Sequence, residues 1–109
     1  MRKNPPWTRE EETLLLDVYL TYGMVGATHP AVKELSLLLN AMPHQEGAPT
    51  YRNPPGVAMK LANLASLDPS HIGAGLTRAS RLDRELWDEL AGNPAELARL
   101  AREIRSKHA

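Results

Sequence analysis

Residues 51–66 contain the side chains whose types and spacing suggest a chemical task. Arg52 and Asn53 stand just before two prolines, and Met59 and Asn63 follow one helical turn apart. An arginine can bind a phosphate or the O6 and N7 acceptors of guanine, and an asparagine offers an amide edge to a base. A thioether offers an apolar surface to a methyl group. These side chains are typical of recognition of a nucleic acid and not of bond making or breaking.

The same stretch is expected to form a helix with two unlike faces. Asn53 suits the N-cap, and Pro54 suits the first helical position, where a backbone N–H has no partner within the helix. The apolar face comprises Val57, Leu61, Leu64 and Ala65, with Ala58 at its edge. The opposite face is small and polar and comprises Gly56, Met59, Asn63 and Ser66, flanked by Lys60. We interpret the stretch as a DNA-recognition helix, and an ordinary amphipathic core helix is the alternative.

The distribution of charge favours the same region. The formal net charge is zero, which argues against a strong nonspecific nucleic-acid binder. Residues 51–82 nevertheless carry four basic side chains against one acid, and residues 1–6 add two more basic side chains. Residues 7–46 carry two basic side chains against six acids. Phosphate contacts are therefore expected from the N-terminal arm and from the surroundings of the central helix.

The first helix is expected to be central to the fold. Thr8 and Glu11 have the spacing of a capping box, Trp7 precedes them as an apolar anchor, and Gly23 is a suitable C-terminal stop. One apolar face comprises Leu14, Leu15, Val18 and Tyr22, and the other side comprises Leu16 and Leu20. A helix that is apolar on both sides is usually packed between two others.

Similar signals mark the other helices. His29 and Pro30 open a second helix, Ser80 and Asp83 form a second capping box, and Gly92 ends the fourth helix. A fifth helix starts at Asn93-Pro94, with Glu96 in the capping-box position. We predict an all-α fold with a tri-helical, helix-turn-helix or Myb-like core and two additional C-terminal helices. The predicted single domain spans 1–109, as a basic arm (1–6), the tri-helical core (7–67), a loop (68–79) and a C-terminal helical hairpin (80–107).

Composition argues against most catalytic and membrane functions. There is no cysteine, and the four histidines (His29, His44, His71 and His108) are scattered. No nucleophile or metal-binding motif is present, and the acids Asp83, Glu85, Asp88 and Glu89 are interspersed with arginine, as on a solvated helix face. We therefore predict a binding domain without catalytic residues, metal or cofactor. The chain also has no apolar run of membrane-spanning length and no signal peptide, so a cytoplasmic location is expected.

Two segments resemble the Myb class of tri-helical DNA-binding units. The segment Trp7-Thr8-x-Glu10-Glu11-x-x-Leu14-Leu15, followed by Tyr19, resembles the opening of a Myb helix. Arg52-Asn53-Pro54-x-x-Val57 resembles the start of the third, DNA-reading helix. The later tryptophans of a Myb repeat are missing, and two further helices follow.

A second resemblance covers nearly the whole chain. Its motifs are Asn4-Pro5-Pro6-Trp7-Thr8-Arg9-Glu10, His29-Pro30, Leu35-Ser36-x-Leu38-Leu39-Asn40, Tyr51-Arg52-Asn53-Pro54-x-Gly56-Val57-x-Met59-Lys60-Leu61-Ala62-Asn63, Leu67-Asp68-Pro69 and Gly75-Leu76. This pattern is similar to the N-terminal domain of McrA-type restriction endonucleases, which carry a C-terminal HNH nuclease domain. The resemblance implies a bacterial domain that senses 5-methylcytosine or 5-hydroxymethylcytosine in double-stranded DNA. Because the chain stops at Ala109 without a nuclease constellation, we expect it to be the sensing domain of a larger endonuclease.

A cytosine methyl group lies in the major groove, so its detection needs an apolar contact. Met59 is the first candidate and Tyr51 the second, although Tyr51 could equally be a core aromatic. Since the aromatic side chains are expected mainly in the core, we predict readout of the intact duplex without base flipping. By analogy, two copies could bind one symmetric site.

The residues expected to contact DNA are Arg2, Lys3, Tyr51, Arg52, Asn53, Gly56, Met59, Lys60, Asn63, Arg78, Ser80 and Arg81. Among these, Arg78, Ser80 and Arg81 are either backbone contacts or simply solvated residues. One alternative function is a protein–protein interaction module with an exposed patch of Leu16, Leu20, Leu37 and Ile104. The other is DNA binding without a preference for modified cytosine.

Overall fold

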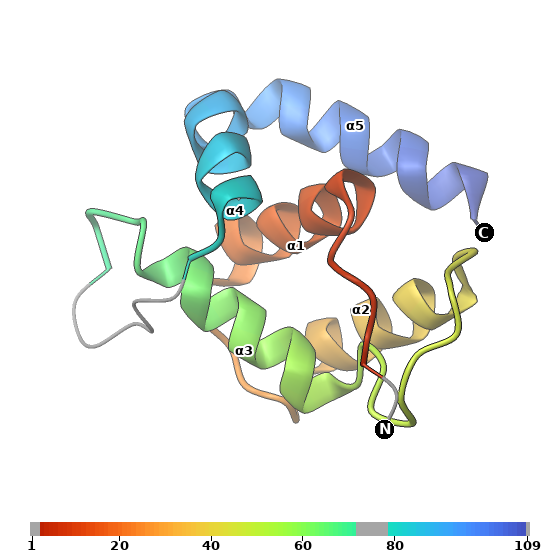
Figure 1. The fold of residues 1–109 in the computed structure, drawn as a ribbon. Helices are drawn as coiled ribbons and strands as arrows, with labels where there is room; N and C mark the ends of the chain where they lie inside the picture. Colours follow the sequence, from red (N-terminus) through yellow and green to blue (C-terminus); the bar gives the residue numbers. More distant parts are fainter. Residues whose placement is uncertain (1–2, 72–78, 109) are drawn as a thin grey trace.

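The computed structural model describes residues 3–71 and 79–108, and its regular elements are all helical (Figure 1). In chain order they are α1 (Arg9–Tyr22), α2 (Pro30–Ala41), α3 (Pro54–Ala65), α4 (Arg81–Leu86), the π-helical turn η1 (Trp87–Ala91) and α5 (Pro94–Lys107). The described part of the chain contains no strand. The predicted all-α fold is confirmed, and the predicted fourth helix consists of α4 followed directly by η1.

Local capping signals set the starts of the helices. The Thr8 and Ser80 side chains each form a reciprocal capping box, with Glu11 at the start of α1 and Asp83 at the start of α4. His29 accepts a hydrogen bond from the Ala31 N–H at the start of α2. Helix α5 begins at Pro94 as predicted, but its N-cap makes no side-chain hydrogen bond. The predicted cap role of Glu96 is therefore wrong, because its carboxylate pairs with Arg99 instead.

Helix α1 is the centre of the fold. It contacts α2, α3, α4, η1 and α5, and Figure 1 shows it between α5 on one side and α2 and α3 on the other. Leu14, Leu15 and Leu16 are almost completely buried, so the prediction of a helix packed on both sides is confirmed. Tyr22 and Leu20 are exceptions, because both side chains are exposed, and the Tyr22 ring lies against His29 at the end of α1.

The three N-terminal helices pack against one another, and the C-terminal hairpin covers the remaining side of α1. Contacts join α1 to α2, α1 to α3 and α2 to α3, which is the tri-helical arrangement expected from the sequence. Leu86, Leu90 and Leu97 bring the C-terminal helices into the same core. This arrangement leaves one long side of α3 on the molecular surface.

Candidate nucleic-acid interface

The outward side of α3 carries small side chains and one large apolar side chain. Pro55, Met59 and Ser66 are exposed, and Gly56 is partly exposed. Met59 keeps 59% of its surface accessible and is the exposed large hydrophobic residue of this helix. The opposite side of α3 is fully packed, so its apolar face is confirmed. An α-helix with such a face can approach another surface closely.

Asn63 departs from the predicted outward face. It is only 9% exposed, and its Oδ1 atom has no hydrogen-bond partner among the described residues. The expectation that Asn63 presents an amide edge to a base is therefore wrong, because α3 is covered on that side. At the other end of the helix the prediction is confirmed: Asn53 caps α3, and its side-chain oxygen accepts the Gly56 N–H at 2.9 Å. Because this cap uses the side-chain oxygen of Asn53, the NH₂ group of its amide remains available to a partner.

Arg52 does not lie on the surface. Its Nε and Nη2 atoms donate to the two carboxylate oxygens of Glu11 at 2.9 and 3.0 Å, and Nη2 also donates to the Pro5 and Pro6 carbonyls. The guanidinium carbon lies 4.2 Å from the centre of the Trp7 ring. The prediction that Arg52 contacts DNA is wrong, because its side chain is only 3% exposed and its charge is matched inside the protein.

Tyr51 also belongs to this interior cluster. Its hydroxyl donates to Glu11 at 3.1 Å, and its ring stacks on His44 with a centroid separation of 4.0 Å. Burial, together with the nearby Glu11 charge, raises the pKa of Tyr51 to about 12. The expectation that Tyr51 touches a cytosine methyl is wrong, and the alternative of a core aromatic is correct.

Lys60 forms a second charge cluster, which joins α1, α3 and α4. Its Nζ atom donates to Asp83 Oδ1 at 2.8 Å and lies 3.9 Å from a carboxylate oxygen of Glu12. The Lys60 side chain is 13% exposed, whereas Glu12 and Asp83 are fully buried. The prediction of a phosphate contact for Lys60 is therefore wrong, since its ammonium group is largely buried and its charge is matched by Asp83.

The two acids of this cluster have opposite pKa shifts. Burial, followed by the hydrogen bond with Asp83, raises the pKa of Glu12 to about 8. Burial also opposes ionisation of Asp83, but hydrogen bonds from Glu12 and Lys60 outweigh it and hold the Asp83 pKa below its ordinary value. At neutral pH, Glu12 therefore carries the proton and Asp83 carries the negative charge that faces Lys60.

Glu11 and Glu12 are the interior residues that the sequence interpretation missed. The capping-box pattern assigns Glu11 only to the start of α1, and no sequence motif singles out Glu12. Their spacing held the missing signal, because each stands three and four residues before buried leucines of the run Leu14–Leu16. Residues at these separations share a helix face, so the spacing indicates that both acids lie at the edge of the core.

The other predicted contact residues have mixed positions. Lys3 is exposed on the arm, which is hydrogen-bonded close to the start of α3. Ser80 is exposed but serves as the N-cap of α4, and the Arg81 side chain is 94% exposed, with Glu85 at 3.2 Å. Arg2 and Arg78 lie outside the described residues. The exposed positive charge near α3 therefore comes from Lys3 on the arm and from Arg81 at the start of α4, which pairs with Glu85.

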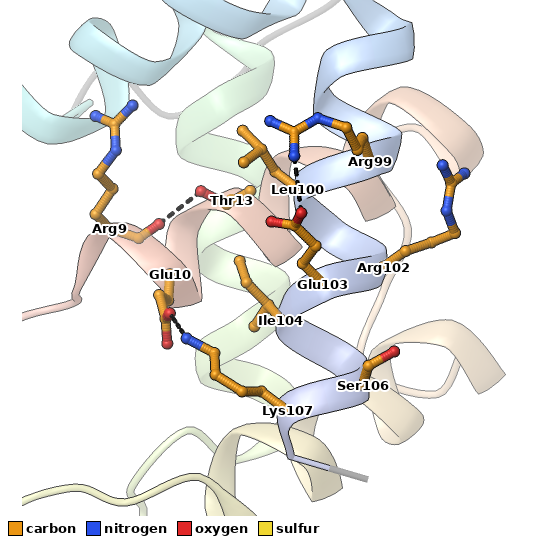
Figure 2. Close-up of a pocket in the computed structure, with 10 residues that line it drawn as sticks. All are labelled: Arg9, Glu10, Thr13, Arg99, Leu100, Arg102, Glu103, Ile104, Ser106 and Lys107. Carbon is orange, nitrogen blue, oxygen red and sulfur yellow. Dashed lines mark hydrogen bonds and ion pairs between the residues drawn. The ribbon is translucent and has the colours of Figure 1, made fainter.

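A groove of about 900 Å³ runs between the start of α1 and α5 (Figure 2). Thr13, Leu100 and Ile104 line it, and charged side chains surround it. These charges are largely matched in pairs: Lys107 contacts Glu10, and Arg99 donates to Glu103 at 2.8 Å (Figure 2). Within the described residues, no group of three or more histidine or acidic side chains could hold a metal ion.

The apolar patch expected for a protein-interaction module is not present. Leu16 is 1% exposed and Ile104 is 7% exposed, so both are core residues. Leu37 and Leu20 remain accessible, at 74% and 39%. The exposed part of the proposed patch is therefore reduced to two single leucines on different helices.

Comparisons with protein-family models, with curated proteins and with solved structures gave no significant match. None of the helices in the described ranges is both long enough and apolar enough to cross a membrane.

Proposed function

We propose that this chain binds double-stranded DNA and senses 5-methylcytosine or 5-hydroxymethylcytosine with the outward side of α3. In this proposal it is the targeting domain of a modification-dependent restriction endonuclease whose HNH nuclease domain lies elsewhere. The observation that carries the proposal is Met59, a large apolar side chain that is 59% exposed among small neighbours on the third helix of a tri-helical core.

The dimensions of the helix and the groove support this mode of binding. The major groove is about 12 Å wide and admits an α-helix of about 10–12 Å with its side chains. Gly56 and Ser66 add little bulk on the outward side of α3, so the backbone can come close to the base edges. The Met59 thioether would then meet the 5-methyl group, which projects into this groove. A base inside the duplex is reached without flipping.

Positioning on the sugar-phosphate backbone falls to the exposed basic residues. Lys3 and Arg81 are accessible, and the sequence prediction adds Arg2 and Arg78. Arg52 and Lys60 take no part in this proposal, because their charges are matched in the interior. The free NH₂ group of Asn53 is available to a phosphate or a base edge beside the start of α3.

Binding to three duplexes of one sequence tests the proposal. The duplexes differ only in carrying cytosine, 5-methylcytosine or 5-hydroxymethylcytosine. We expect tighter binding to at least one modified duplex and weaker binding to all three as the salt concentration rises. Equal affinity for the three would leave DNA binding without modification sensing. No salt-sensitive binding to any of them would remove DNA as the partner.

A further inference from the structure

The N-terminal arm is attached to the folded body by specific contacts. Asn4 Oδ1 accepts a hydrogen bond from the Ala48 N–H at 2.8 Å, and Asn4 Nδ2 lies 3.5 Å from the Thr50 hydroxyl. The next two carbonyls, those of Pro5 and Pro6, accept hydrogen bonds from Arg52 at 3.0 and 3.1 Å. Residues 4–6 therefore have a defined path along the loop of residues 42–53.

Gly47 makes this path possible. A Cβ atom at Gly47 would lie 2.7 Å from Asn4 Oδ1, 3.3 Å from Pro5 Cδ and 2.9 Å from the Tyr51 ring. Separations under 3.0 Å are not tolerated by side-chain carbons, so any larger residue would push against the arm. Glycine is needed here for space, since it lets the arm and the loop come into contact.

The same contacts fix the arm relative to α3. Arg52 directly precedes the Asn53 N-cap and has a left-handed backbone conformation, with φ of 45°. Its carbonyl accepts a hydrogen bond from the Ser36 hydroxyl at 2.6 Å, which ties it to α2. The residue that binds the arm therefore directly precedes the N-cap of α3, so the arm lies beside the start of this helix.

We propose that the loop of residues 42–53 is a seat that preorganises the N-terminal arm as a second DNA-contacting element beside α3. Asn4, Gly47 and Arg52 are positioning residues in this proposal, and Lys3 is the residue that meets a backbone phosphate. The inference rests on the proposed function and adds a preformed contact to it. Because the arm is ordered before binding, the conformational entropy of ordering it is not lost on association.

Two variants undock the arm, and a third is their control. Gly47→Ala introduces the clash, and Asn4→Ala removes the hydrogen bond to Ala48 without touching the core. Gly26→Ala is the matched control, because a Cβ atom at Gly26 has nothing within 4 Å. In Gly47→Ala, which keeps Asn4, hydrogen exchange of the Ala48 amide reports whether the arm is docked, since that N–H donates to Asn4. Binding to the cytosine and 5-methylcytosine duplexes is then measured at several salt concentrations.

We expect both undocking variants to lose protection at Ala48 and to bind about tenfold more weakly, which is the worth of a charge-assisted hydrogen bond. The loss should be equal on the two duplexes, because a phosphate contact does not depend on the base. Lys3→Ala should weaken binding similarly and reduce the salt slope by about 1. In the Asn4→Ala background, Lys3→Ala should have a smaller effect, since the contact is already lost.

One result would contradict only the role of the arm, and another would contradict DNA binding itself. If the wild type binds the duplexes and Gly47→Ala loses Ala48 protection but binds as tightly as Gly26→Ala, the arm is not a contact and the inference is wrong. If the wild type binds none of the duplexes, the proposed function fails and the inference fails with it.

Discussion

Arg52 is a charged residue whose side chain is buried and paired with Glu11. Its guanidinium fork matches both oxygens of Glu11 and two proline carbonyls, between the rings of Trp7 and Tyr51. Burial opposes ionisation of Glu11, but hydrogen bonds from Arg52 and Thr8 outweigh it and hold the Glu11 pKa below its ordinary value. The pair is therefore fully charged at neutral pH and contributes to stability only as long as both partners are present.

Removal of the Arg52 side chain should therefore destabilise the fold. We expect Arg52→Ala to lower the free energy of unfolding by about 3–5 kcal/mol, because it leaves the Glu11 carboxylate buried without its partner. The stability of Arg52→Lys should lie between those of the wild type and Arg52→Ala, since lysine keeps the charge but lacks the planar fork. Chemical denaturation measures both. Arg81→Ala, at a side chain that is 94% exposed, is the control and should change stability by less than about 0.5 kcal/mol. An Arg52→Ala protein as stable as this control would contradict the interior role.

Met59 is the residue on which modification sensing depends. We expect Met59→Ala to reduce the preference for the 5-methylcytosine duplex by about fivefold, because an apolar contact with the methyl group is lost. Affinity for the unmodified duplex should change little. The matched control is Leu37→Ala, at a residue of α2 that is 74% exposed, and it should leave both affinities unchanged. A Met59→Ala protein that keeps the full preference would show that another residue meets the methyl group.

At the scale of elements, local and long-range features differ in how well the sequence predicts them. Capping residues such as Thr8, His29 and Asn53 act within one turn of their own helix, and each cap was found where the pattern indicated. The partners of Arg52 and Lys60 could not be predicted in the same way. Glu11 is 41 positions from Arg52, and Asp83 is 23 from Lys60, so both pairings depend on how the helices cross.

The cluster of Glu12, Lys60 and Asp83 joins three helices and should make stability depend on pH. The Glu12 pKa is about 8 in the folded protein and near its ordinary value of 4.5 in the unfolded chain. Between pH 4.5 and pH 8 the folded state therefore binds a proton that the unfolded state has released. Stability should therefore fall as the pH rises from about 4.5 to about 8 and change little from this group above that range, with a slope of up to about 1.4 kcal/mol per pH unit.

Denaturation of wild type and Glu12→Gln between pH 5 and pH 9 measures this effect. The variant cannot ionise at this position, so its stability should fall less steeply over the window. Glu34→Gln, at an exposed position on α2, is the control and should follow the wild type. Parallel profiles for wild type and Glu12→Gln would contradict the protonated state of Glu12.

At the scale of the whole molecule, the proposed interface is electrostatically modest. The formal net charge is zero, and the basic residues of the central stretch are partly withdrawn into the core. If Lys3 and Arg81 act together with Arg2 and Arg78, at most four phosphates are contacted. The plot of log affinity against log salt should then have a slope of about −2 to −4, since each contact contributes about −0.9. Fluorescence anisotropy at several salt concentrations measures it, and a slope near zero would exclude phosphate contacts.

An NMR measurement of the contact between the Met59 ε-methyl group and the DNA shows whether α3 meets the modified base. The protein is labelled at its methionine methyl groups and bound to a duplex that carries 5-methylcytosine, and Met24 and Met42 serve as internal references. We expect a nuclear Overhauser effect between the Met59 methyl and the cytosine 5-methyl, with a clear shift of the Met59 signal. A Met59 signal that does not change on saturation with the duplex, while signals of another surface shift, would contradict this expectation.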